Sequence, residues 1–221
     1  MPVAKKIAEA AQHSSWIRQM FEEGARLAAT HGSDKVFDFS IGNPNLEPPE
    51  QFQRVMEQLV HDCSPGHHGY MSNAGYSFAR SAVAAFLAQE QGVPVTADHV
   101  VMTVGAGGSL NVILKAILDP GDEVIVPRPY FMEYNSYADN HGGVVRPVVT
   151  KPDFQLDVDA VEAAIGTNTR AVLINSPNNP TGRVYPEPAL SALGEVLRRK
   201  SRELGRIIYL IADEPYRRIV Y

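Results

Sequence analysis

Cysteine is almost absent from this sequence: Cys63 is the only one among 221 residues, so no disulfide bond can form within the chain. Such usage is typical of a reducing compartment, and we expect a cytoplasmic protein. No apolar run is long enough for a secretory signal or a membrane span, so we expect no membrane partner. The net charge is -5 and no basic block occurs, which argues against nucleic acid as a partner.

Hydrophobic residues make up 44% of the chain, enough to bury a core in one large domain or two small ones. Apolar residues at helical spacing predict amphipathic helices over residues 7–27, after Pro48 and Pro49, and over residues 78–87. Residues 64–75 are rich in Gly, His, Ser and Asn, and this composition predicts a loop.

From residue 99 onward, short apolar runs alternate with helical patterns. The runs are apolar throughout, as strands are when both faces of their sheet are buried. The sequence therefore predicts an α/β fold with a mainly parallel sheet and helices on both faces. The five predicted strands are residues 99–104, 123–126, 143–149, 170–174 and 207–212.

Parallel sheets bind ligands beyond the carboxyl ends of their strands, so the loops after the predicted strands are the candidate sites. Gly105-Ala106-Gly107 opens a helix after the first strand. Free backbone N–H groups and the helix dipole suit a phosphate there, although a plain tight turn has the same composition. After the second strand, Phe131 and Tyr134 suit either stacking on a flat ring or core packing.

The remaining loops carry polar side chains. Residues 175–182 contain two prolines and a glycine, and such a rigid loop suits an amide that binds a ligand, or is simply a turn. Asp213 ends the fifth strand. A carboxylate there needs a partner, which is a metal ion, a protonated ring nitrogen or a structural cation.

Six short segments, taken in their order along the chain, resemble the class I/II aminotransferases, which are enzymes of fold type I that depend on pyridoxal phosphate. Each segment is modest alone, but six in the family's order are specific, and the resemblance spans residue 36 to the end. It implies transfer of an amino group between an amino acid and a 2-oxo acid. The segments are residues 41–44, Tyr70 with Gly75 and Arg80, and residues 105–107, 129–131, 178–182 and 213–216.

The resemblance implies a role for each residue around the cofactor ring. Asp213 would pair with the pyridine nitrogen and keep it protonated, so that the ring withdraws electrons. Asn179 and Tyr216 would hydrogen-bond the phenolic oxygen, and Phe131 would stack on the ring. Asp213 and Tyr216 are the residues to which the resemblance assigns catalysis.

The cofactor phosphate and the substrate have implied partners too. The phosphate would lie at Gly105, Ala106 and Gly107. Tyr70 would reach the phosphate of a neighbouring subunit's cofactor, which implies a homodimer with shared active sites. Gly42 would contact the substrate carboxylate. No metal is implied.

The resemblance also implies an N-terminal arm and small-domain segment, residues 1–48, and an incomplete cofactor-binding large domain, residues 49–221. The family's Schiff-base lysine lies a few tens of residues beyond the Asp213 motif, and no lysine here stands in that context. In the family the first strand lies at a sheet edge, apart from the fifth. Since later strands and the C-terminal small domain are missing, we expect exposed apolar faces, aggregation or partial folding, and a catalytically incomplete fragment.

Other functions stay open on the residues alone. A nicotinamide-dependent oxidoreductase fits Gly105-x-Gly107, but Leu110 stands where its third glycine belongs. A nucleotide triphosphatase fits an apolar strand that ends at Asp213, but the glycine loop lacks the lysine of a P-loop. Within the fold, a lyase or synthase that uses pyridoxal phosphate, or a non-catalytic pyridoxal-binding or interaction module, is the nearer alternative. A zinc site is conceivable from His61, Cys63, His67 and His68.

Overall fold

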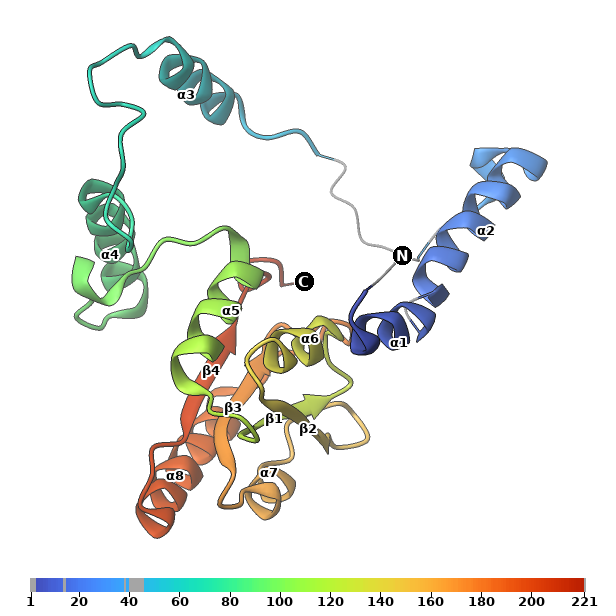
Figure 1. The fold of residues 1–221 in the computed structure, drawn as a ribbon, viewed down its shortest axis with the longest axis vertical. Helices are drawn as coiled ribbons and strands as arrows, with labels where there is room; N and C mark the ends of the chain where they lie inside the picture. The colour runs from blue at the N-terminus through green and yellow to red at the C-terminus, as the bar shows by residue number, and fades with distance from the viewer. Residues whose placement is uncertain (1–2, 14, 38, 40–45, 221) are drawn as a thin grey trace. The chain divides into compact units, whose positions relative to one another are not determined.

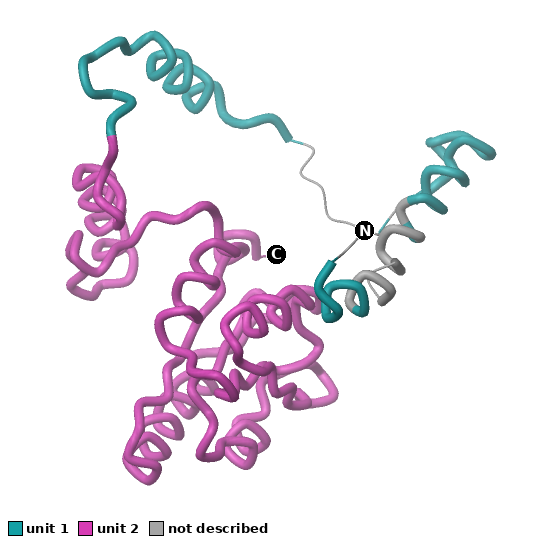
Figure 2. Tube along the Cα trace, in the orientation of Figure 1, with its two compact units in different colours: residues 1–69 teal, residues 70–221 magenta. Residues whose placement is uncertain are grey.

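The computed structural model describes residues 3–13, 15–37, 39 and 46–220. The chain divides into two compact units, Met1–Gly69 and Tyr70–Tyr221, which Figure 2 colours separately. The division expected from the sequence, at residue 48, stays a prediction.

The first unit is helical in its described part. It contains α1 (Lys5–His13), α2 (Ser15–His31), the short 3-10 helix η1 (Ser33–Lys35) and α3 (Glu50–His61). Gly32 ends α2 with a φ of 95°, a backbone angle that L side chains rarely adopt. Pro49 precedes α3 as its N-cap residue, in agreement with the predicted start. No residue of α3 is buried, so its apolar stripe is exposed.

The second unit holds the sheet (Figure 1). Its strands are β1 (Glu123–Arg128), β2 (Val144–Val149), β3 (Thr169–Asn175) and β4 (Tyr209–Asp213), in the order β2-β1-β3-β4. All neighbouring pairs are parallel. The helices are α4 (Ser77–Gln91), α5 (Gly105–Ile117), α6 (Glu133–Asp139), α7 (Val158–Ala164) and α8 (Glu187–Leu204), with a 3-10 turn η2 (Ala97–His99).

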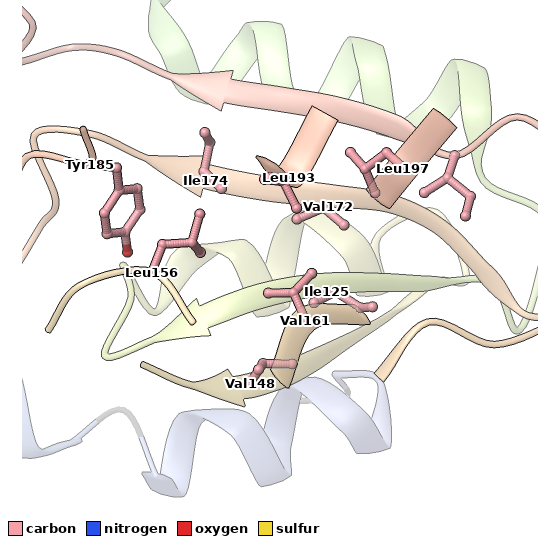
Figure 3. Packing of buried hydrophobic residues seen from close by; sticks show 10 residues of the cluster. Ile125, Val148, Leu156, Val161, Val172, Ile174, Tyr185, Leu193 and Leu197 are labelled. Carbon is pink, nitrogen blue, oxygen red and sulfur yellow. The ribbon is translucent and has the colours of Figure 1, made fainter. Parts of the chain in front are cut away.

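Successive residues of each strand point to opposite faces of the sheet, and each face has its own helices. One face carries Ile125 and Val172, which pack with Val161 of α7 and Leu193 of α8 (Figure 3). The other face packs against α5 and α6 through the buried residues Leu110, Leu114, Leu118, Val124, Val126, Tyr134, Ala171, Leu173 and Ile211. The predicted α/β fold with helices on both faces is therefore confirmed.

The strand predicted over residues 99–104 is wrong. His99 ends η2, and residues 100–104 join no strand of the described chain. An extended segment becomes a strand only when a neighbour pairs with its backbone, and here the Met102 N–H donates to the Ala74 carbonyl, 2.9 Å away, in a loop. Val104 is 95% exposed, as expected if this segment stands apart from β4. Aggregation or partial folding stays a prediction.

Candidate cofactor site

A cavity of about 100 Å³ opens beyond the carboxyl ends of β3 and β4. The register pairs Asn175, the last residue of β3, with Asp213, the last residue of β4, so both side chains reach this end of the sheet. Phe131 and Tyr216 at its rim are 37% and 40% exposed, so a ligand larger than the cavity can extend towards solvent. The cavity is lined by Ala106, Gly107, Leu110, Phe131, Tyr134, Tyr137, Asn175, Asn179, Asp213, Pro215 and Tyr216.

Asp213 is held by a tyrosine. The Tyr134 hydroxyl donates a hydrogen bond to Asp213 Oδ2 at 2.5 Å, and the Tyr134 side chain is buried. Burial first, and then this hydrogen bond to a carboxylate, raises the pKa of Tyr134 well above its usual value, so the phenol keeps its proton. Since a phenol donates one hydrogen bond, Asp213 Oδ1 is left free to accept another.

The same tyrosine orients the aromatic wall of the cavity. The Phe131 ring meets the Tyr134 ring edge to face, with centroids 5.6 Å apart and an interplanar angle of 84°. The Tyr130 ring stacks on the Tyr134 ring with centroids 6.3 Å apart, and the Tyr130 hydroxyl donates to Asn135 Oδ1. Aromatic pairs prefer these geometries, so the packing fixes the plane in which Phe131 faces the cavity.

Asn175 connects the two polar loops. Its Nδ2 donates to the Asp213 carbonyl at 2.8 Å, and its Oδ1 accepts the Asn179 N–H at 2.5 Å. The next asparagine, Asn178, is buried, and its Oδ1 accepts from the Thr181 N–H and hydroxyl. These bonds account for the buried amides and leave the Asn179 side chain to line the cavity.

The glycine turn forms the first turn of α5. Gly105 begins the helix with a φ of 68°, a conformation that suits glycine. The first N–H groups of a helix have no partner within it, so those of Ala106 and Gly107 are available beside the cavity. A Cβ on Gly107 would lie 2.9 Å from the Tyr137 hydroxyl, so a larger residue at this position would displace the phenol.

The cavity brings together six of the nine site residues expected from the sequence: Ala106, Gly107, Phe131, Asn179, Asp213 and Tyr216. Gly105 begins the same helix but does not line the cavity. Tyr70 does not line it either, and its side chain is fully exposed. Gly42 lies outside the described residues. The role assigned to each residue stays a prediction.

Two further residues of the Tyr70 motif have structural contacts. Gly75 has a φ of 100°, and a Cβ there would lie 2.7 Å from the Met102 side chain. The Arg80 guanidinium donates to the carbonyls of Ala97 and Val100, so it holds the backbone that leads to α5.

Sequence reasoning assigned no role to Tyr137 or Asn175, and it left Tyr134 open between stacking on a ring and core packing. Tyr134 is three residues after Phe131 and Tyr137 three residues later, which is the spacing of one helix face, and this was a usable signal. Asn175 is the last residue of the buried strand β3, as Asp213 is the last residue of β4, and its position at a strand end carried the same signal.

Metal and cation partners for Asp213 do not occur in the described chain. There, no three His, Cys, Asp or Glu residues could hold a metal ion together, so the zinc alternative at His61, Cys63, His67 and His68 is not formed. Asp213 has no ion pair with a described Lys or Arg. Among the described helices none has the length and apolar character of a membrane span.

Known proteins match this chain in sequence and in structure. The sequence profile of the family described as "Aminotransferase class I and II" matches residues 34–221. A probable aspartate/prephenate aminotransferase of Thermus aquaticus is 38% identical over 82% of this chain and 46% of its own length. An aspartate aminotransferase of Geobacillus stearothermophilus is 30% identical over 100% of this chain and 53% of its own length.

A crystal structure of an aminotransferase from Eubacterium rectale superposes with a TM-score of 0.94 and 42% identity, over 100% of this chain and 56% of that one. The chain thus spans about half the length of the curated relatives it matches. It belongs to the class I and II aminotransferases, a family whose cofactor is pyridoxal phosphate.

Proposed function

We propose that the protein to which this chain belongs transfers an amino group between an amino acid and a 2-oxo acid with bound pyridoxal phosphate. The observation that carries the proposal is the cavity in which a carboxylate, an aromatic ring, an amide and a helix N-terminus meet. Two relatives are named for aspartate, so aspartate is the donor to test first.

The residues of the cavity fit this cofactor. When bound, the protonated pyridine ring withdraws electrons from the α carbon of the substrate. Asp213 would hold the proton on the ring nitrogen through Oδ1, while Tyr134 keeps Oδ2 in place. Asn179 and Tyr216 would hydrogen-bond the phenolic oxygen of the ring.

The walls of the cavity suit the rest of the cofactor. Phe131 would stack on the ring, because Tyr134 fixes its plane. The N–H groups of Ala106 and Gly107, at the positive end of α5, would hold the phosphate. Gly105 would shape this turn.

The reaction also needs an amine that moves protons at the substrate. The six lysines of the sequence all lie in the described residues, and none lines the cavity. We propose that the amine comes from outside these 221 residues and that this chain alone binds cofactor without turnover. A homodimer is part of the proposal, because the Tyr70 side chain is fully exposed and free to reach a neighbouring subunit. So is a cytoplasmic location, which a single cysteine suits.

The test is an isotope transfer assay on the native protein, isolated from its source with an antibody raised against this chain. Incubation with ¹⁵N-aspartate and 2-oxoglutarate should give ¹⁵N-glutamate, and other labelled amino acids define the donor range. Asp213→Ala in the native protein should reduce turnover at least about 100-fold, since it removes the charge that holds the ring proton. A protein that carries pyridoxal phosphate but transfers no label from any donor would instead be a lyase, a synthase or a non-catalytic binding module.

A further inference from the structure

Tyr137 places a hydroxyl group at the glycine turn. It lies on α6 and lines the same cavity as Ala106 and Gly107. It makes no hydrogen bond to Asp213, and that carboxylate acts on it only through its charge. Its oxygen lies 2.9 Å from where a Cβ of Gly107 would stand. The hydroxyl therefore occupies the space that a side chain at position 107 would fill, directly beside the first turn of α5.

Two asparagines connect α6, the helix that carries Tyr137, to the first turn of α5. Asn111 Nδ2 donates to the Gly107 carbonyl at 2.9 Å. Asn140 Nδ2, at the end of α6, donates to Asn111 Oδ1 at 3.2 Å. The hydrogen bonds of these two asparagines connect α6 to the turn that carries Gly107.

The hydroxyl is an unused donor. Tyr134 and Tyr130, its neighbours, donate to Asp213 and Asn135, but the Tyr137 hydroxyl has no hydrogen-bond partner among the described residues. Burial first, and then the carboxylates of Glu133 and Asp213, raises the pKa of Tyr137, so the phenol is protonated at neutral pH. A half-buried donor without a partner next to free helix N–H groups is suited to an anionic oxygen.

We propose that Tyr137 donates a hydrogen bond to the phosphate of the cofactor, beside the N–H groups of Ala106 and Gly107. This role rests on the proposed function, because it requires that a pyridoxal phosphate lies in the cavity. It makes Tyr137 a residue that selects the phosphorylated cofactor over its unphosphorylated form.

The test compares two ligands that differ only in the phosphate, pyridoxine 5′-phosphate and pyridoxine. Neither has an aldehyde, so surface lysines cannot capture them. Isothermal titration calorimetry on the 221-residue chain gives the affinity ratio of the two. Tyr137→Phe should reduce the affinity for pyridoxine 5′-phosphate about tenfold and leave that for pyridoxine unchanged, which is the size expected for one hydrogen bond to a charged group.

A second variant displaces the hydroxyl without removing it. Gly107→Ala would place a Cβ 2.9 Å from the Tyr137 oxygen, so the phenol must swing away, and the same selective loss is expected. Tyr209→Phe is the matched control: Tyr209 begins β4 at the end away from the cavity, and its hydroxyl, like that of Tyr137, makes no hydrogen bond in the described chain, so both affinities should stay unchanged.

The outcomes separate this role from the proposed function. If the unsubstituted chain binds neither ligand, the role of Tyr137 is refuted for this chain, while the proposed function is decided separately by the isotope transfer assay on the native protein. If the unsubstituted chain binds both ligands and Tyr137→Phe alters neither affinity, or alters both equally, only the role of Tyr137 is refuted.

Discussion

Asn175→Ala should loosen the cavity and destabilise the second unit. The side chain is buried, and its two hydrogen bonds join the end of β3 to the Asn179 N–H and to the Asp213 carbonyl. Alanine removes both bonds and leaves two backbone groups without a partner in a partly buried place. No other described side chain bridges these two loops.

The magnitude follows from the two bonds. Each neutral hydrogen bond contributes about 1 kcal/mol to stability, and stranded partners that water reaches only in part add to this. We expect a loss of about 2–3 kcal/mol in the free energy of unfolding. With a urea m value of about 2 kcal/mol/M, the midpoint should fall by about 1 M.

The assay is urea unfolding followed by circular dichroism at 222 nm. Asn168→Ala is the matched control, because Asn168 is exposed and its side chain makes no hydrogen bond in the described chain, so its effect should stay within about 0.5 kcal/mol. Calorimetry on Asn175→Ala should also show weaker binding of pyridoxine 5′-phosphate. A midpoint for Asn175→Ala equal to that of the control would refute the bridging role.

Three further predictions concern a buried ion pair, the Asp213 partner and the lysines. Burial tends to raise the pKa of Asp122, but hydrogen bonds from the Asp119 N–H and from Arg206 hold it below its usual range. A carboxyl group whose pKa is lowered by folding stabilises the folded chain at pH values above its pKa in the unfolded chain, about 3.9. This stabilisation is lost as the pH falls through the pKa of the group in the folded chain. In urea unfolding, Asp122→Asn should thus lower the free energy of unfolding by about 1.5 kcal/mol at pH 7 and by clearly less below pH 4. A loss of stability that is the same at both pH values would contradict this. Tyr134→Phe should weaken binding of pyridoxine 5′-phosphate about fivefold in calorimetry, because Asp213 Oδ2 loses its hydrogen-bond donor. An unchanged affinity would mean that Tyr134 does not position Asp213. After incubation with pyridoxal phosphate and borohydride reduction, the intact mass of this chain should show no stoichiometric pyridoxyl adduct, since no lysine lines the cavity. One adduct per chain would contradict the assigned site.

The parts of the site that lie at strand ends were predictable from sequence. Asn179 follows β3 and Asp213 ends β4, and the carboxyl ends of parallel strands meet at one edge of a sheet. The structure has β3 and β4 as neighbours, which brings both residues to one cavity. For Asn179 and Asp213, the pattern of an apolar strand followed by a polar residue was enough to predict a place at the site.

Contacts between distant elements were not predictable in the same way. The bond from Tyr134 to Asp213 joins residues 79 positions apart and depends on how α6 is rotated above the sheet. The approach of Tyr137 to Gly107 depends on the same rotation. No periodicity in one sequence determines it.

Strand boundaries depend on pairing as much as on composition. The apolar run at residues 123–126 predicted too short a strand, because β1 continues to Arg128 where β2 pairs with it. Residues 99–104 are just as apolar, yet no described strand lies beside them. Hydrophobicity marks a segment as suited to a sheet, and the neighbour decides whether it becomes a strand.

We propose that Asp213 faces the ring nitrogen of a pyridoxal phosphate bound in this cavity. The most direct test of this proposal is the ¹⁵N chemical shift of ring-labelled pyridoxine 5′-phosphate bound to the chain and to Asp213→Asn. We expect a protonated ring nitrogen in the unsubstituted chain at neutral pH, and a neutral one in the variant. A ring nitrogen that is neutral in both, or protonated in both, would contradict it.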